Sequence, residues 1–80
     1  MRTLLYGKGA VKTLGRMPKH DGQALVAKLE RYARGDPQDV IKLKGSDAHR
    51  LRHGDWRALF TVTKTEIRVE VIVNRREAYR

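Results

Sequence analysis

From residue 40 onward, apolar and polar side chains alternate in steps of two, and this pattern most limits how the chain can fold. Successive side chains of a strand point to opposite faces of a sheet, so the alternation predicts strands with one buried face. Turn residues separate the segments at Gly54-Asp55 and around Lys64-Thr65. An antiparallel sheet is therefore predicted from VIKLKG (40–45), AHRLRH (48–53), WRALFTVT (56–63) and EIRVEVIVNRR (66–76).

The first half of the chain favours helices instead. After a short predicted strand at residues 2–6, apolar residues take helical spacing over residues 8–17 and again over residues 19–34. Gly35 and Pro37 are typical of a helix end. The sequence therefore predicts an α+β fold of order β-α-α-β-β-β, in which two helices pack on one face of a small, mostly antiparallel sheet.

Size and charge narrow the class of protein. Eighty residues form a single domain (1–80) with a small core, and the absence of cysteine excludes disulfides and thiolate metal sites. The longest apolar run, Ala24–Ala27, has four residues, so we expect no membrane segment, and the absence of cysteine fits a reducing cytoplasm, where we expect the protein to be located. Eighteen Lys and Arg against nine Asp and Glu give a net charge of +9, which favours a polyanionic partner. Nucleic acid, an acidic protein and an anionic membrane are all partners that this positive charge would attract.

Strand parity shows where the charges gather. With Gly54-Asp55 as a two-residue loop, Arg52 lies directly opposite Arg57, and Arg50 shares their face. Like charges opposite each other destabilise a hairpin by a few tenths to about 1 kcal/mol. Such a violation of folding rules indicates a functional, phosphate-binding face. The other face is apolar and is predicted to meet the helices through Leu51, Trp56, Ala58, Phe60 and Val62.

The last strand is predicted to follow the same alternation. Its core face would carry Ile67, Val69, Val71 and Val73. The opposite face would carry Arg68, Glu70, Ile72, Asn74 and Arg76, so that Arg76 points the same way as the three hairpin arginines.

The segments LKGSDAHRLRHGDWRALF and VNRREAYR resemble the RelE/ParE toxin superfamily, and in particular its RelE-like branch. The resemblance covers the whole chain, with its specific motifs in residues 43–80. It implies a type II toxin that cuts messenger RNA on the ribosome, inhibits translation, and uses the neighbouring ribose 2′-hydroxyl without a metal or cofactor. It also implies a cognate antitoxin, and contact with operator DNA only through the antitoxin complex.

Carried over to this chain, the resemblance assigns catalysis to five residues and RNA contacts to three more. The catalytic residues are Arg50, Arg52, Arg57, Arg76 and Tyr79, and the RNA contacts are Lys42, Lys44 and Arg75. Arginine does not lose its proton in proteins, so the arginines suit charge stabilisation and not a general base.

The local candidates for acid or base are His49 and His53, although parity predicts both on the core side of the sheet. Two histidines four apart on a strand do not converge on a metal, so no metal site is predicted.

Two alternatives remain open at this point. One is a ParE-like inhibitor of DNA gyrase with the same fold, against which the arginine cluster and Tyr79 argue. The other is a nucleic-acid-binding module without chemistry, or a toxin that has lost its activity. Few aromatic residues are present, which argues against a broad stacking platform for single strands.

Overall fold

A computed structural model describes residues 1–78 and confirms the predicted fold class. The predicted order counts three strands after the helices, whereas the structure has four, because the segment 40–45 contains a separate short strand. The last strand ends at residue 74 and is followed by a helical turn, where the sequence predicted strand to residue 76. The elements in order are β1 (Thr3–Tyr6), α1 (Lys8–Arg16), α2 (Lys19–Ala33), β2 (Val40–Lys42), β3 (Ala48–His53), β4 (Trp56–Val62), β5 (Glu66–Asn74) and α3 (Arg75–Ala78).

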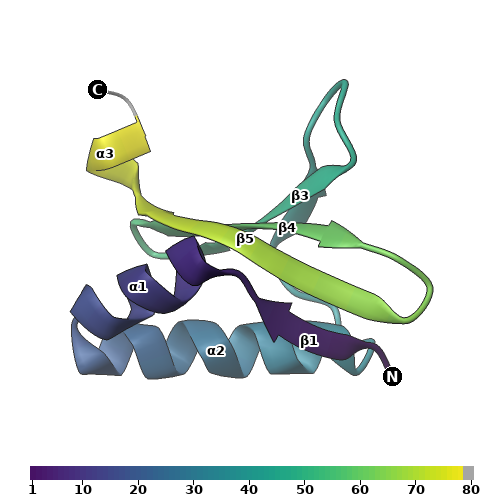
Figure 1. Ribbon diagram of the computed structural model, residues 1–80, viewed down its shortest axis with the longest axis horizontal. Coiled ribbons are helices and arrows are strands. Elements are labelled where there is room, and N and C mark those ends of the chain that lie inside the picture. Colours follow the sequence, from purple (N-terminus) through teal and green to yellow (C-terminus); the bar gives the residue numbers. More distant parts are fainter. Residues whose placement is uncertain (79–80) are drawn as a thin grey trace.

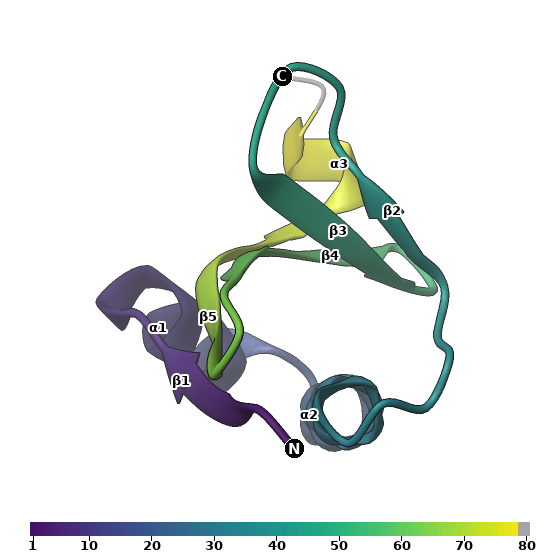
Figure 2. The same ribbon diagram turned by 90° about the vertical axis from the view of Figure 1, so that its right-hand side faces the viewer.

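The strands form one sheet in the order β1-β5-β4-β3-β2. The β1–β5 pair is parallel and the other three pairs are antiparallel. Helices α1 and α2 lie on one face of this sheet, whereas α3 and the β2–β3 loop stand on the opposite side (Figures 1 and 2). We call the side that faces away from α1 and α2 the outer face.

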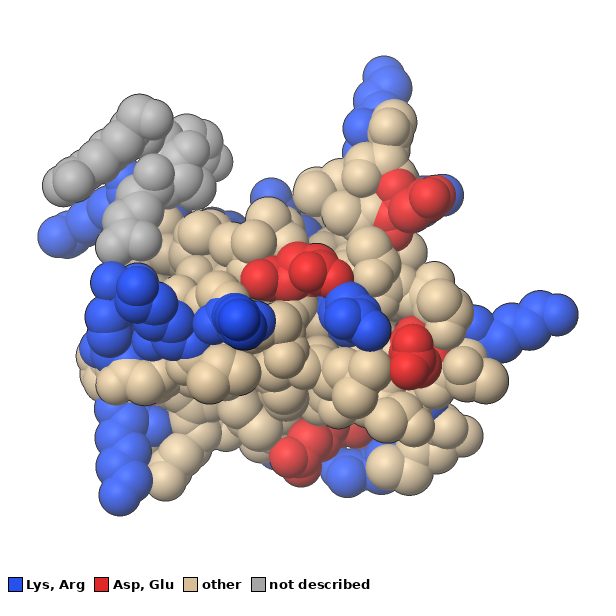
Figure 3. All heavy atoms as spheres, in the orientation of Figure 1, with Lys and Arg blue, Asp and Glu red and all other residues tan. Residues whose placement is uncertain are grey.

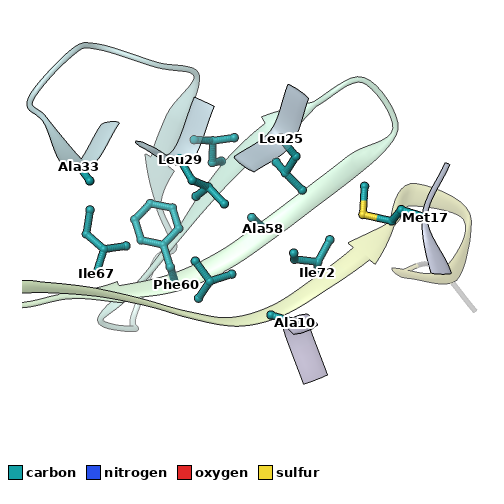
Figure 4. Close-up of a cluster of buried hydrophobic side chains, with 11 residues drawn as sticks. Ala10, Met17, Leu25, Leu29, Ala33, Ala58, Phe60, Ile67 and Ile72 are labelled. Carbon is teal, nitrogen blue, oxygen red and sulfur yellow. The ribbon is translucent and has the colours of Figure 1, made fainter. Parts of the chain in front are cut away.

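The core lies between the sheet and α2 (Figure 4). Helix α2 buries Leu25, Leu29 and Ala33 at a spacing of four residues, which places them on one side of the helix. They meet Phe60, the largest fully buried side chain, whose ring also lies 5.4 Å from that of Tyr32. Gly35 follows the helix with φ of 98°, a left-handed conformation that explains why glycine ends α2.

Tyr6 enters this core from β1, where it partners Val69 of β5. Its hydroxyl is buried and has no hydrogen-bond partner within the described residues. Burial, together with the negative charge of Glu30, raises the pKa of Tyr6 to about 12. The phenol therefore stays neutral at any physiological pH and acts as a core side chain.

A β-bulge in β5 overturns the predicted faces of its second half. Leu59 pairs with Val71 and Phe60 with Val69, so Glu70 is an extra residue on β5. A bulge shifts the alternation by one residue from that point onward. The predictions for Val71, Val73, Ile72 and Asn74 were therefore wrong: Ile72 is 2% exposed in the core, and Val71 is 40% exposed on the outer face.

This correction can be tested by stability. We expect Ile72→Ala to lower the free energy of unfolding by about 2–5 kcal/mol, because it leaves a cavity in the core. We expect Val71→Ala to cost less than about 1 kcal/mol, because Val71 is half in solvent. Urea denaturation of the two variants measures both values. If β5 were a regular strand without the bulge, Val71→Ala would lower the free energy of unfolding more than Ile72→Ala.

Candidate nucleic-acid interface

The β3–β4 hairpin has the predicted register. Arg52 partners Arg57, and Leu51 partners Ala58. Gly54 takes φ of 57°, and among residues 1–78 no residue other than glycine has a positive φ, which is the pattern of a two-residue type II′ turn. Because Leu51, Ala58 and Phe60 are fully buried against the helices, the arginines of alternate parity face outward.

The side chain of Arg57 is hydrogen-bonded to the turn that precedes it. Its Nη1 donates to the carbonyl oxygen of Gly54 at 3.0 Å and to that of Trp56 at 3.2 Å. These two bonds use one nitrogen of the guanidinium, and Nε and Nη2 donate no hydrogen bond to the described residues. A planar guanidinium with one end fixed and the other unpaired suits bidentate contact with a phosphate.

Arg50 presents a second unpaired donor. Its Nε is buried and has no hydrogen-bond partner within residues 1–78. Its register neighbours on either side are apolar, Ile41 on β2 and Leu59 on β4. A buried unpaired donor costs about 1–3 kcal/mol, and an anion that accepted from Arg50 would remove this cost.

A hydrogen bond joins the end of β5 to the same hairpin turn. The Arg75 backbone N–H donates to the Asp55 carbonyl oxygen at 2.5 Å. Arg76 follows as the second residue of α3, so the prediction that strand parity aligns it with the other arginines was wrong, because β5 ends at Asn74. The chain instead carries Arg76 to this corner of the sheet in a helical turn. Tyr79 lies outside the described residues.

The outer face also has an apolar row that the sequence analysis missed. Ile41 (45% exposed), Leu59 and Val71 share one register row with Arg50. Leu59 could have been found from the sequence, since it has the parity of Arg57. Val71 could not, because only the bulge turns it outward.

The predicted RNA-contacting lysines separate in the structure. Lys42 partners His49, whose other neighbour is the buried Phe60, so Lys42 has the parity of the helix side. Lys44 lies in the β2–β3 loop, which stands on the outer-face side of the sheet (Figure 1). The structure thus brings Lys44, and not Lys42, to the side of the arginines.

Both histidines lie on the helix side, as parity predicted. His49 stacks on Phe60 with ring centroids 5.6 Å apart. His53 Nε2 lies 3.8 Å from Asp21 Oδ1 at the start of α2. Neither is among the arginines, and residues 1–78 contain no cluster of three metal-ligating side chains.

Positive charge is not confined to this site. Lys8, Lys12 and Arg16 occupy successive turns of α1, which contains no acidic residue, and Lys and Arg side chains gather at the α1 end of the molecule in Figure 3. The net charge alone therefore does not identify the outer face as the binding site. No helix of the described residues has the length and apolar character to cross a bilayer.

Comparison with known proteins finds solved structures with a similar fold. No protein-family model and no curated protein sequence matches the chain. A chain of the RelB-RelE antitoxin-toxin complex from Methanococcus jannaschii matches with a TM-score of 0.80 and 23% identity, over 94% of each chain. A chain of the RelE-RelB complex from Pyrococcus horikoshii OT3 matches at 0.74 and 28%, over 92% of this chain and 94% of that one. YafQ from E. coli matches over the full length of both chains at 0.68 and 16%.

These likenesses extend over nearly the whole chain and define the fold as RelE-like. The resemblance found in the sequence motifs is thereby confirmed. By its fold the chain is RelE-like, and the structure of 28% identity from the RelE-RelB complex supports the likeness of its motifs to the RelE-like toxin superfamily.

The arginine pair of the hairpin gives a test of this interface. We expect Arg52→Gln to raise the free energy of unfolding by a few tenths to about 1 kcal/mol at low salt, because it removes the repulsion from Arg57. The gain should fall towards zero in 1 M salt, which screens exposed charges. Denaturation at the two salt concentrations measures both effects, with Lys64→Gln in the β4–β5 turn as the control. A loss of stability in Arg52→Gln at low salt would show that the two guanidinium groups do not repel each other.

Proposed function

We propose that this chain is the toxin of a toxin–antitoxin system and that it is a ribosome-dependent endoribonuclease. The observation that carries the proposal is the hairpin pair Arg52 and Arg57, which form no ion pair within the described residues, beside the unpaired donor of Arg50. This arrangement is costly for folding and suited to an RNA phosphate. The motif resemblance and the RelE-like fold support the same conclusion.

The proposed reaction is an attack by the ribose 2′-hydroxyl on the adjacent phosphorus. The 2′-oxygen loses its proton and bonds to phosphorus, and the bond from phosphorus to the 5′-oxygen of the next nucleotide breaks. The products are a 2′,3′-cyclic phosphate and a 5′-hydroxyl, whose oxygen takes up a proton. The extra negative charge of the phosphorane transition state is the part of this reaction that arginines stabilise.

We assign the arginines of the outer face to that charge. Arg57 is oriented by its bonds to the turn, so its remaining donors need no reorganisation to meet the transition state. Arg52 and Arg76 add positive charge at the same corner, and the unpaired Nε–H of Arg50 donates to an anion. Positive charge around the 2′-hydroxyl also lowers its pKa, so that water can accept its proton.

We assign Tyr79, which the resemblance matches to the family's C-terminal tyrosine, to stacking on a base of the messenger RNA. Its phenol, or a nearby cation, supplies the leaving-group proton. Lys44 and Arg75 are proposed to contact the RNA backbone, and the placement of Lys42 makes it a weaker contact. The histidines take no part in this scheme, because they lie across the sheet.

The proposed partners follow from the same comparisons. Several of the similar structures are complexes of a toxin with its antitoxin, so we propose a cognate antitoxin for this chain. The apolar row of Ile41, Leu59 and Val71 gives an antitoxin a surface to bury on the outer face, next to the arginines. Ribosome and messenger RNA are the proposed cytoplasmic targets, and operator DNA is contacted only through the antitoxin complex.

Primer extension on translated messenger RNA tests the activity. We expect codon-specific cuts with the purified protein, and a fall in cutting rate of about 100-fold or more for Arg57→Ala and for Arg76→Ala. Lys28→Ala in α2 is the control, because it removes a positive charge from the opposite side of the sheet. Circular dichroism should show that all three variants are folded. Uncut messenger RNA together with inhibited DNA gyrase would replace this proposal with the gyrase-inhibitor alternative.

A further inference from the structure

The turn between β3 and β4 and the start of α3 form one hydrogen-bonded unit. We call it the turn–α3 junction, and it consists of residues 54–57 and 74–76. Arg57 Nη1 bonds to two carbonyl oxygens of the turn, and the turn's Asp55 carbonyl accepts from the Arg75 backbone N–H. Trp56 and Asn74 are also cross-strand partners. The orientation of Arg57 and the direction in which the chain leaves β5 therefore depend on the same few bonds.

Asn74 has a specific place in this junction. Its Oδ1 accepts a hydrogen bond from the backbone N–H of Arg76 at 3.0 Å. An asparagine that precedes a helix and accepts from the second helical residue is an N-cap, one of the residue types that most favour a helix start. Because α3 spans four residues and nucleating a helix is unfavourable, α3 depends on such bonds and not on its own propensity.

The cap also decides where Arg76 goes. The segment 66–76 is rich in β-branched residues and contains neither glycine nor proline, so the sequence alone favours a longer β5. The N-cap ends the strand at Asn74 and turns the chain to the outer-face side of the sheet, where α3 stands opposite α1 and α2 (Figure 1). Without the cap, the Arg76 N–H has no partner in the junction and the extended path competes with the helical turn.

We propose that Asn74 is a positioning residue: by capping α3 it holds Arg76 at the same corner of the outer face as Arg57, in the place where both meet one RNA phosphate. The proposal rests on the proposed function for the identity of the ligand. It assigns no contact with RNA to Asn74 itself. It therefore predicts that the hydrogen-bond acceptor at position 74 matters, and that the volume of the side chain does not.

Two variants separate these effects. Asn74→Ala removes the acceptor, and Asn74→Ser keeps an oxygen that caps helices as well as asparagine does. We expect Asn74→Ala to lower kcat for cutting by about fivefold or more with a smaller change in KM, since the ground state still binds through the other cations. We expect Asn74→Ser to stay within about twofold of the wild type. Thermal unfolding should show that both variants are folded.

A second readout does not depend on catalysis. Amide hydrogen exchange followed by NMR should show faster exchange of the Arg76 N–H in Asn74→Ala, and protection restored in Asn74→Ser. A 2′-O-methyl RNA trinucleotide, which lacks the attacking hydroxyl, should shift the Arg57 and Arg76 Nε–H signals in the wild type and in Asn74→Ser. In Asn74→Ala it should shift the Arg57 signal alone.

The outcomes distinguish this inference from the proposed function. If the wild type binds the trinucleotide but cuts no RNA, the nuclease proposal fails and the NMR signals still decide the role of Asn74. Unchanged Arg76 protection in Asn74→Ala overturns the inference, as does a wild type in which the trinucleotide leaves the Arg76 signal unmoved. Failure of Asn74→Ser to restore the Arg76 signals also overturns it, because the volume of the side chain would then be what matters.

Discussion

The burial of one side of the β3–β4 hairpin against the helices is the constraint on which the rest of the structure depends. Two guanidinium groups are placed opposite each other because Leu51, Ala58 and Phe60, on the alternate parity of the same strands, are fully buried. Burying a Leu or Phe side chain stabilises the fold by about 1.5–3 kcal/mol, more than the cost of one like-charge pair. The core therefore imposes the register, and the register imposes the arginine pair. The bonds from Arg57 to the turn carbonyls then fix the direction of one of the two charges.

Two local departures from regular structure complete the outer face. The bulge at Glu70 brings Val71 outward beside Leu59, which gives the cationic face an apolar row. The end of β5 at Asn74 then sends Arg76 into α3. Both departures occur on β5, which lies between β1 and β4 in the sheet. One strand therefore shapes the surface to which the hairpin contributes the positive charge. A surface with both arginines and exposed apolar residues suits RNA and also a protein that competes with RNA for it.

Much of this arrangement could be predicted from the sequence, because much of it follows from periodicity. The alternation in residues 48–63 and the Gly54-Asp55 turn determine the hairpin register, and the stripe of Leu25, Leu29 and Ala33 determines the buried side of α2. The faces of β5 beyond Glu70 could not be predicted in the same way. A bulge changes the parity of later residues without any change in their composition, as Ile72 and Val71 show. The placement of Arg76 failed for a related reason, since β5 ends at Asn74, whose Oδ1 accepts a hydrogen bond from the Arg76 backbone N–H. The roles of the arginines remain predictions, because geometry shows which charges lie together and not which reaction they promote.

The central claim is that the hairpin arginines themselves hold an RNA phosphate. The most direct measurement is the salt dependence of the affinity for a short 2′-O-methyl RNA. Each phosphate contact to a single strand contributes about 0.7 to the slope of log affinity against log salt. Arg52→Gln/Arg57→Gln should therefore reduce the slope by about 1.4, whereas Lys28→Gln/Arg31→Gln, which removes the same charge from α2, should leave it unchanged. Equal losses in the two double variants would contradict the account, because RNA would then bind to the overall charge of the protein and not to the outer face.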